Sequence, residues 1–193
     1  MIETLRNIDI TIDETRVLRY FGYRRGTPPP DIPDFQDILS IAERLMRPEI
    51  YYTVSSVDSN GGETVSFDNG IRLGDAVLLE KVRKGRRGLF FLASLGPGLE
   101  ACITGFLEKG LCLEGTLLDG ACWVALQEVI KGFKKTFVDE VVDFTLVPGL
   151  KNFPLERQRD IFGLFSGKET GMTLTEECML IPRKSLSGIM IFH

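Results

Sequence analysis

The chain has 193 residues, of which 44% are hydrophobic and 26% charged, a composition typical of one globular domain. The formal net charge of -4 gives the chain no general attraction for nucleic acid. No segment approaches the ~18 to 20 uninterrupted apolar residues of a membrane span. The first residues, MIETLRNIDITIDETR, are too acidic for a signal peptide, so we expect a cytoplasmic protein that binds neither nucleic acid nor a membrane.

Histidine and cysteine usage limits the chemistry that the chain can perform. The only histidine is His193, the last residue, so a Ser-His-Asp or Cys-His mechanism within the chain is not expected. The basic run at 81–88 (KVRKGRRG) lies between an expected helix and an expected strand, which favours a solvated connection over a binding patch. No Cys-x-x-Cys or Cys/His spacing of a metal site occurs, and we expect four reduced thiols at Cys102, Cys112, Cys122 and Cys178.

The first fifty residues predict a strand and two helices. Apolar and polar residues alternate at 8–12 (IDITI), which predicts a short strand. A helix is expected after Asp13, a suitable N-cap, and a second helix is expected from Pro33 to the residues before Pro48. Apolar side chains recur at helical spacing in the two helices, at Val17, Leu18 and Phe21 and at Phe35, Ile38, Ile41, Ala42 and Leu45.

The next segments predict mainly strands. β-branched and aromatic residues dominate 49–57 and 62–73, and the turn sequences DSNGG and DNG favour an antiparallel meander. A short helix is expected at 74–85, capped near Asp75. The continuous apolar run within 86–96 predicts a buried central strand.

The second half of the chain predicts further helices and strands. Helices are expected at 97–110 and 111–133, a strand at 138–149, a proline-started helix at 152–165, and a closing pair of strands at 172–193. Strands and helices do not alternate as they do in doubly wound folds. We therefore expect an α+β fold, with a mixed, largely antiparallel sheet covered by helices.

This fold is expected to form one domain over residues 1–193. The N-terminal strand and helix, within 1–47, are expected to pack on its main body.

Three segments in the same order resemble the activation domain of cobalamin-dependent methionine synthase. They are SLGPGLEACITGFLEKGLCLEGTLLDGACWVALQEV, VPGLKNFPLERQRDIFGLF and TGMTLTEECMLIPRKSLSGIMIF, and the resemblance covers roughly Gly22 to His193. The chain looks like a free-standing version of this domain, without the folate-, homocysteine- and cobalamin-binding modules. The closing motif of the family is matched in order by Gly171, Leu174, Thr175, Glu176, Pro182, Ser185, Ser187 and Gly188.

The resemblance implies an accessory role in the reductive reactivation of a corrinoid protein whose cobalt has been oxidised to Co(II). In the family, S-adenosylmethionine bound beside cobalamin remethylates the cobalt with one electron from a flavodoxin-type donor. The expected partner is a corrinoid-binding methyltransferase, or a methionine synthase that lacks its activation domain, and the cobalamin is carried by this partner. The protein itself would contribute positioning rather than covalent chemistry.

The resemblance also implies a ligand-binding turn, which reads Arg-x-x-Pro-Gly-Tyr in the family. Pro148 and Gly149 match it, but Thr145 replaces the arginine that contacts the ligand carboxylate and Leu150 replaces the tyrosine. Threonine does not offer the paired donors of an arginine. Lys151 is a hypothetical substitute, since it follows the turn. The implied cofactor-binding residues here are Thr145, Val147, Pro148, Gly149, Leu150 and Lys151.

Further site residues are implied elsewhere, each with a structural alternative. Glu128 corresponds to a helix acid that contacts the ligand amine, or else is a surface carboxylate. Ser185 and Ser187 share one face of a strand that either faces the ligand or corrinoid partner, or is merely half-exposed. Glu176 belongs to the same closing motif. Trp123 is expected to pack in the core, with a corrinoid-facing wall as the alternative.

Three classes of function remain open at this point. The first is reactivation of a corrinoid protein with S-adenosylmethionine as methyl donor. The second is a non-catalytic docking module that binds a corrinoid protein without S-adenosylmethionine, which the residues at Thr145 and Leu150 favour. The third is the binding of an unrelated small molecule.

Overall fold

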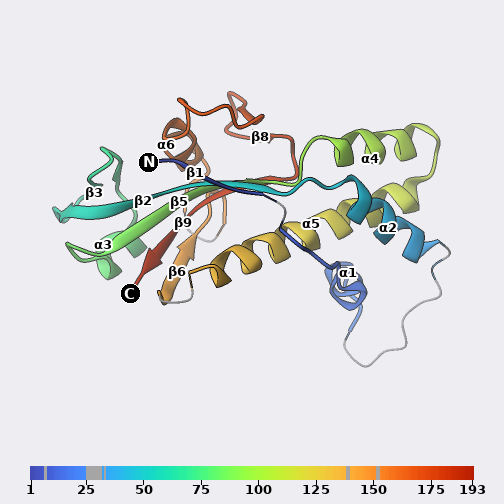
Figure 1. Ribbon diagram of the computed structural model, residues 1–193, viewed down its shortest axis with the longest axis horizontal. Helices are drawn as coiled ribbons and strands as arrows, with labels where there is room; N and C mark the ends of the chain where they lie inside the picture. The colour runs from blue at the N-terminus through green and yellow to red at the C-terminus, as the bar shows by residue number, and fades with distance from the viewer. Residues whose placement is uncertain (7, 25–31, 33, 138–139, 151–152) are drawn as a thin grey trace.

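A computed structural model describes residues 1–6, 8–24, 32, 34–137, 140–150 and 153–193. Its main feature is a seven-stranded antiparallel sheet with the order β4-β3-β2-β5-β9-β6, in which β1 lies beside β2 (Figure 1). The strands are β1 (Glu3–Arg6), β2 (Glu49–Asn60), β3 (Val65–Phe67), β4 (Arg72–Leu73), β5 (Arg87–Ser94), β6 (Val142–Leu146) and β9 (Ser185–Phe192), with a separate pair of β7 (Thr173–Leu174) and β8 (Leu180–Ile181).

The helices cover both faces of this sheet, so the predicted α+β class with a largely antiparallel sheet is confirmed. The long helix α5 runs under the sheet and past its end, where α1, α2 and α4 pack around it, whereas α6 lies above the sheet (Figure 1). The helices are α1 (Glu14–Tyr20), α2 (Phe35–Leu45), α3 (Ala76–Lys81), α4 (Gly98–Glu108), α5 (Cys112–Lys135) and α6 (Arg157–Gly163).

Two hydrophobic cores form, one on each face of the sheet. Side chains alternate between the faces along a strand, so neighbours in β5 such as Phe90 and Phe91 enter different cores. Phe91 packs in the core that α5 covers, with Met190 and Phe133, whereas Phe90 packs in the core that α6 covers, with Ile189. The continuous apolar run of β5 is therefore explained by burial on both faces, as the sequence predicted.

Helix α5 carries much of the first core because small residues let its neighbours approach closely. A Cβ atom added at Gly120 would lie 2.5 Å from Cζ of Phe21, which follows α1 directly. The predicted N-cap of α1 is confirmed, since the Asp13 carboxylate accepts a hydrogen bond from the Thr15 backbone N–H at 2.9 Å. Trp123 was expected to pack in the core, and its side chain does pack against this core but is only partly buried.

The strand predicted at 8–12 is wrong. The first strand is β1, and the described residues 8–12 pair with no other strand. Ile8, Ile10 and Ile12 bury their side chains against the first core, and the backbone N–H of Ile12 donates to Oε1 of Glu43 at 3.2 Å. Burial of an apolar segment against helices thus produced an alternation that resembles a strand.

Two further elements differ from the sequence prediction in extent. Helix α6 begins at Arg157, three residues after Pro154, because the intervening residues form turns closed by the Arg157 and Gln158 N–H groups. The strand expected at 138–149 is confirmed only as β6, and residues 138–139 lie outside the described part of the chain. The closing segment contains β9 and the small β7–β8 pair rather than two long strands.

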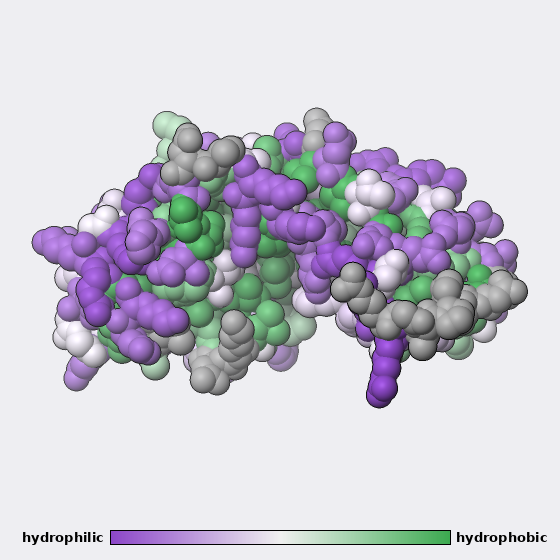
Figure 2. Space-filling view, turned by 90° about the horizontal axis from the view of Figure 1, so that it is seen from below, coloured by the Kyte–Doolittle hydropathy of each residue, from purple (hydrophilic) through white to green (hydrophobic). Residues whose placement is uncertain are grey.

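Figure 2 views the molecule from below, the side of the sheet on which α5 lies in Figure 1. It shows polar and hydrophobic atoms intermixed, with hydrophobic atoms exposed near the middle. Within the described residues, none of the helices has the length and apolarity needed to cross a membrane. No cluster of three or more potential metal ligands occurs in the same part of the chain.

Candidate functional site

The sheet separates the residues that the sequence singled out. Residues directly opposite each other in neighbouring strands share a face. Thr145 lies opposite Met190, on the face covered by α5, whereas Ser187 lies opposite Leu92, on the face covered by α6. Thr145 and Ser187 therefore cannot contact one small ligand from the same side of the sheet.

The Pro-Gly turn is closed by its own hydrogen bonds. The Leu150 N–H donates to the Val147 carbonyl at 3.0 Å, and the Gly149 N–H donates to the Phe153 carbonyl at 2.9 Å. Gly149 has a φ of +80°, which favours glycine, while Pro148 is buried and Leu150 is half exposed. Both amides at the tip of the turn are already used within it. Lys151 lies outside the described residues.

The serines of the closing motif make structural hydrogen bonds. The Ser187 hydroxyl is fully buried and donates to Oε1 of Gln158 at 3.0 Å, and Nε2 of Gln158 donates to the Cys178 carbonyl at 2.6 Å. The Ser185 hydroxyl donates to Oγ of Ser94 at 2.9 Å. Glu176 is exposed, and its backbone carbonyl accepts from Nη2 of Arg159. These bonds attach β9 to β5 and to α6, and they attach α6 to the segment before β8.

Replacing Ser187 by alanine is expected to lower the free energy of unfolding by about 1–2 kcal/mol, because the buried Gln158 oxygen loses its donor. Urea denaturation measures this change. Ser185→Ala is the matched control, since partial exposure lets water replace its hydrogen bond. A Ser187→Ala protein with unchanged stability and weaker ligand binding would contradict the structural role.

A cleft of about 450 Å³ lies between the C-terminal half of α5 and the start of β6. Its walls combine apolar side chains with three lysines: the lining residues are Gln127, Ile130, Lys131, Lys134, Lys135, Glu140 and Val142. A hollow of about 240 Å³ adjoins it through Gln127 and reaches α1, where its other lining residues are Arg16, Arg19, Tyr20 and Val124. The two spaces share Gln127 and together form a groove, the α5 groove, on the same face of the sheet as Thr145.

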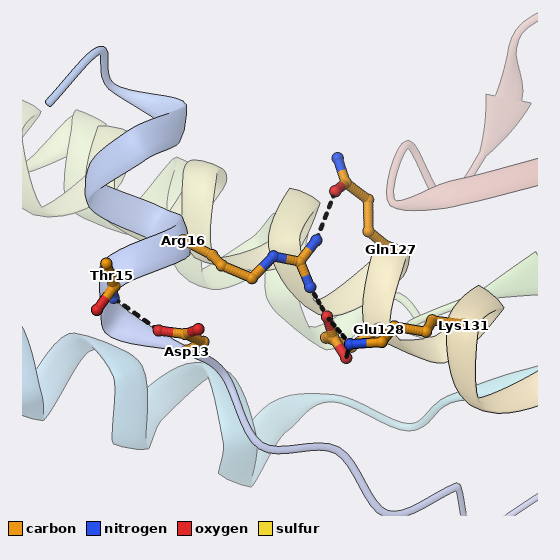
Figure 3. Close-up of polar contacts among 6 residues, drawn as sticks. All are labelled: Asp13, Thr15, Arg16, Gln127, Glu128 and Lys131. Carbon is orange, nitrogen blue, oxygen red and sulfur yellow. Dashed lines mark hydrogen bonds and ion pairs between the residues drawn. The ribbon is translucent and has the colours of Figure 1, made fainter. Parts of the chain in front are cut away.

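Glu128 lies beside this groove in a network with α1 (Figure 3). Nη1 of Arg16 forms an ion pair with Oε1 of Glu128, and Nη2 of Arg16 donates to Oε1 of Gln127 at 2.8 Å. Nζ of Lys131 lies 3.2 Å from Oε2 of Glu128. Two cations already balance the charge of Glu128, so a ligand amine would have to compete with them for this carboxylate.

The electrostatics of the cleft are dominated by cations. Glu140, the one acid among the described residues that line it, pairs with Arg87 at 2.9 Å. Desolvation lowers the pKa of the Lys134 amino group, which is half-buried. These lysines were not identified from the sequence, because the helix predicted at 111–133 ended before Lys134, whereas α5 continues to Lys135. In the longer helix, Lys131, Lys134 and Lys135 have the i, i+3, i+4 spacing of one face.

Thr145 brings one further polar group to this side of the sheet. Its Oγ1 atom is buried and has no hydrogen-bond partner among the described residues. A buried hydroxyl without a partner is unfavourable and therefore uncommon in folded proteins. The position at which the family resemblance implies a ligand contact thus carries a polar atom whose hydrogen-bonding capacity is unused.

Comparison with known proteins finds a similar fold among solved structures. No family model and no curated protein matches the sequence. Among solved structures, the chain is similar to the crystal structure of the MetH reactivation domain bound to AdoHcy, with a TM-score of 0.72 and 16% sequence identity over 100% of this chain and 78% of the other. The protein therefore has the fold of the MetH reactivation domain.

Proposed function

We propose that this protein takes part in the reductive reactivation of a corrinoid methyltransferase and presents S-adenosylmethionine, as methyl donor, to Co(II) cobalamin on a partner protein. The observation that carries the proposal is the likeness in fold to a reactivation domain bound to AdoHcy, which extends over the whole chain. We propose that residues 1–193 form a single domain. An electron donor of the flavodoxin type completes the proposed system.

The proposed ligand site is the α5 groove. The amide of Gln127 supplies a polar group, and Ile130 and Val142 supply apolar wall. Thr145 lies on the same face of the sheet, but its buried Oγ1 is not part of the lining of the groove. The lysines suit the carboxylate of the ligand. They repel its sulfonium, whose methyl group is the group transferred, so the sulfonium is expected to lie away from them. The contribution of the chain is to bind and orient the donor.

Calorimetric titration with S-adenosylmethionine, with S-adenosylhomocysteine as comparison, tests this function. We expect binding in the micromolar range, about 8 kcal/mol. The absence of both a heat signal and a thermal shift at millimolar ligand would overturn the proposal. Remethylation of an oxidised corrinoid protein, followed by its absorption spectrum, tests the later step.

A docking module that binds a corrinoid protein without S-adenosylmethionine is the second candidate. It is favoured by the Pro-Gly turn, whose tip amides bond within the turn, and by Glu128, whose charge is matched by Arg16 and Lys131. Co-elution with a corrinoid protein, together with a negative calorimetric titration, is the result that this candidate predicts. Co-elution that requires S-adenosylmethionine would contradict it.

A further inference from the structure

The lysines of the α5 groove differ in how their charges are matched. Nζ of Lys131 is paired with Glu128, and Lys135 is exposed on the rim. Lys134 also lines the cleft, and among the described residues no ion pair or hydrogen bond involves its amino group. Lys134 is therefore the cation of the cleft that combines partial burial with the lack of a partner.

The surroundings of Lys134 explain why this cation is unmatched. Burial lowers the pKa of its amino group, and in the part of the chain that the structure describes no carboxylate opposes this effect. Glu140, the acid of the cleft wall, is engaged by Arg87. Partial removal of an ammonium group from water without an opposite charge is unfavourable. An anion that enters the cleft would restore the missing interaction, so the site favours an anion over water.

We propose that the cleft binds an oxyanion carried by a small molecule and that the Lys134 amino group is its charge partner. The neighbouring Ile130 and Val142 side chains provide apolar wall for the body of the ligand. Nε2 of Gln127, whose Oε1 accepts from Arg16, offers a donor where the cleft meets the adjoining hollow. This inference rests on the proposed function for the source of the oxyanion, the amino-acid carboxylate of S-adenosylmethionine. Lys134 then serves where the family resemblance places an arginine.

The test separates the carboxylate from the rest of the ligand. Calorimetry compares S-adenosylhomocysteine with 5′-methylthioadenosine, a thioether of the same nucleoside that lacks the amino-acid carboxylate. Lys134→Met, which keeps an apolar stem and removes the charge, is expected to weaken the binding of S-adenosylhomocysteine about 10-fold, as loss of one charge-assisted hydrogen bond does. The same change should leave the binding of 5′-methylthioadenosine unaltered.

Two further variants make the result specific. Lys134→Arg keeps the charge and is expected to retain at least a third of the wild-type affinity for S-adenosylhomocysteine, on the order expected for an Arg-for-Lys exchange at a site with one charge contact. Lys168→Met, at an exposed lysine beyond α6, is the matched control and should change nothing. Equal effects of Lys134→Met on both ligands, or no effect on either, would overturn the role of Lys134.

A titration with adenosine monophosphate separates this inference from the proposed function. If the wild-type protein binds adenosine monophosphate in a Lys134-dependent manner and binds no S-adenosylhomocysteine, the oxyanion site stands and the proposed function fails. If S-adenosylhomocysteine binds and Lys134→Met has no effect, the oxyanion site fails and the proposed function stands. Binding of none of the three ligands overturns both.

Discussion

Replacing Phe133 by alanine is expected to lower the free energy of unfolding by about 3–5 kcal/mol, the range for truncating a buried phenylalanine. The Phe133 side chain is fully buried where α5 meets the sheet. Its ring centroid lies 5.1 Å from that of Tyr52, 5.2 Å from that of Phe137 and 6.1 Å from that of Phe91, all in edge-to-face or inclined arrangements. The substitution would remove the centre of this aromatic cluster and leave a cavity.

Urea denaturation followed by circular dichroism measures this loss. Phe162→Ala is a matched control, because Phe162 also lies on a helix, packs against the second core and is only partly buried. Phe162→Ala should lower the free energy of unfolding by clearly less than Phe133→Ala does. An equal cost for the two substitutions would show that Phe133 does not hold α5 to the sheet through this cluster.

The Phe133 cluster also bears on the α5 groove. Phe133 points to the sheet, while its neighbours Ile130 and Lys134 line the cleft on another side of α5. Loss of the ring would loosen the helix that carries three lysines of the cleft wall. Phe133→Ala is therefore expected to bind S-adenosylhomocysteine more weakly because the protein is less stable. The difference in affinity from the wild type should become smaller when the titration is done nearer the temperature of maximum stability.

The sequence predicted the sheet better than the site, for a physical reason. Strands 49–57 and 86–96 could be recognised because local alternation and continuous apolar runs report burial on one or two faces. The same pattern gave a wrong strand prediction at 8–12, because Ile8, Ile10 and Ile12 are buried against helices without a strand partner. Burial is local information, whereas strand pairing depends on a partner elsewhere in the chain.

Which residues come together at the candidate site depends even more on contacts between distant parts of the sequence. Whether Thr145 and Ser187 share a face is set by the registers of β6 and β5 on β9, and no local pattern contains those registers. The contact of Arg16 with Glu128 joins residues far apart in the sequence, so the balanced charge of Glu128 was also hidden. The shared helix face of the lysines at 131, 134 and 135 would have been visible from their spacing only if the helix predicted at 111–133 had been extended to Lys135, where α5 ends.

Replacing Gly188 by valine is expected to destabilise the protein by about 3 kcal/mol, the upper part of the usual range for overpacking a core. Gly188 belongs to the closing motif that carries the family resemblance. A Cβ atom at this position would lie 2.6 Å from Cζ of Phe91 and 2.8 Å from the backbone oxygen of Leu146. The Phe91 ring is fully buried and the Leu146 oxygen belongs to β6, so neither can move without disturbing the sheet.

Thermal and urea denaturation of Gly188→Val and Gly163→Val test this role. Gly163 lies on α6, and a Cβ atom there would meet nothing within 4 Å, so Gly163→Val should change stability by only a few tenths of a kcal/mol. The expected result would give the closing motif a structural role that needs no contact with a ligand, because Gly188 and the buried Ser187 hydroxyl both hold β9 to its neighbours. If Gly188→Val instead kept full stability and lost affinity for S-adenosylhomocysteine, the motif would belong to the ligand site and the α5 groove would not be the whole of it.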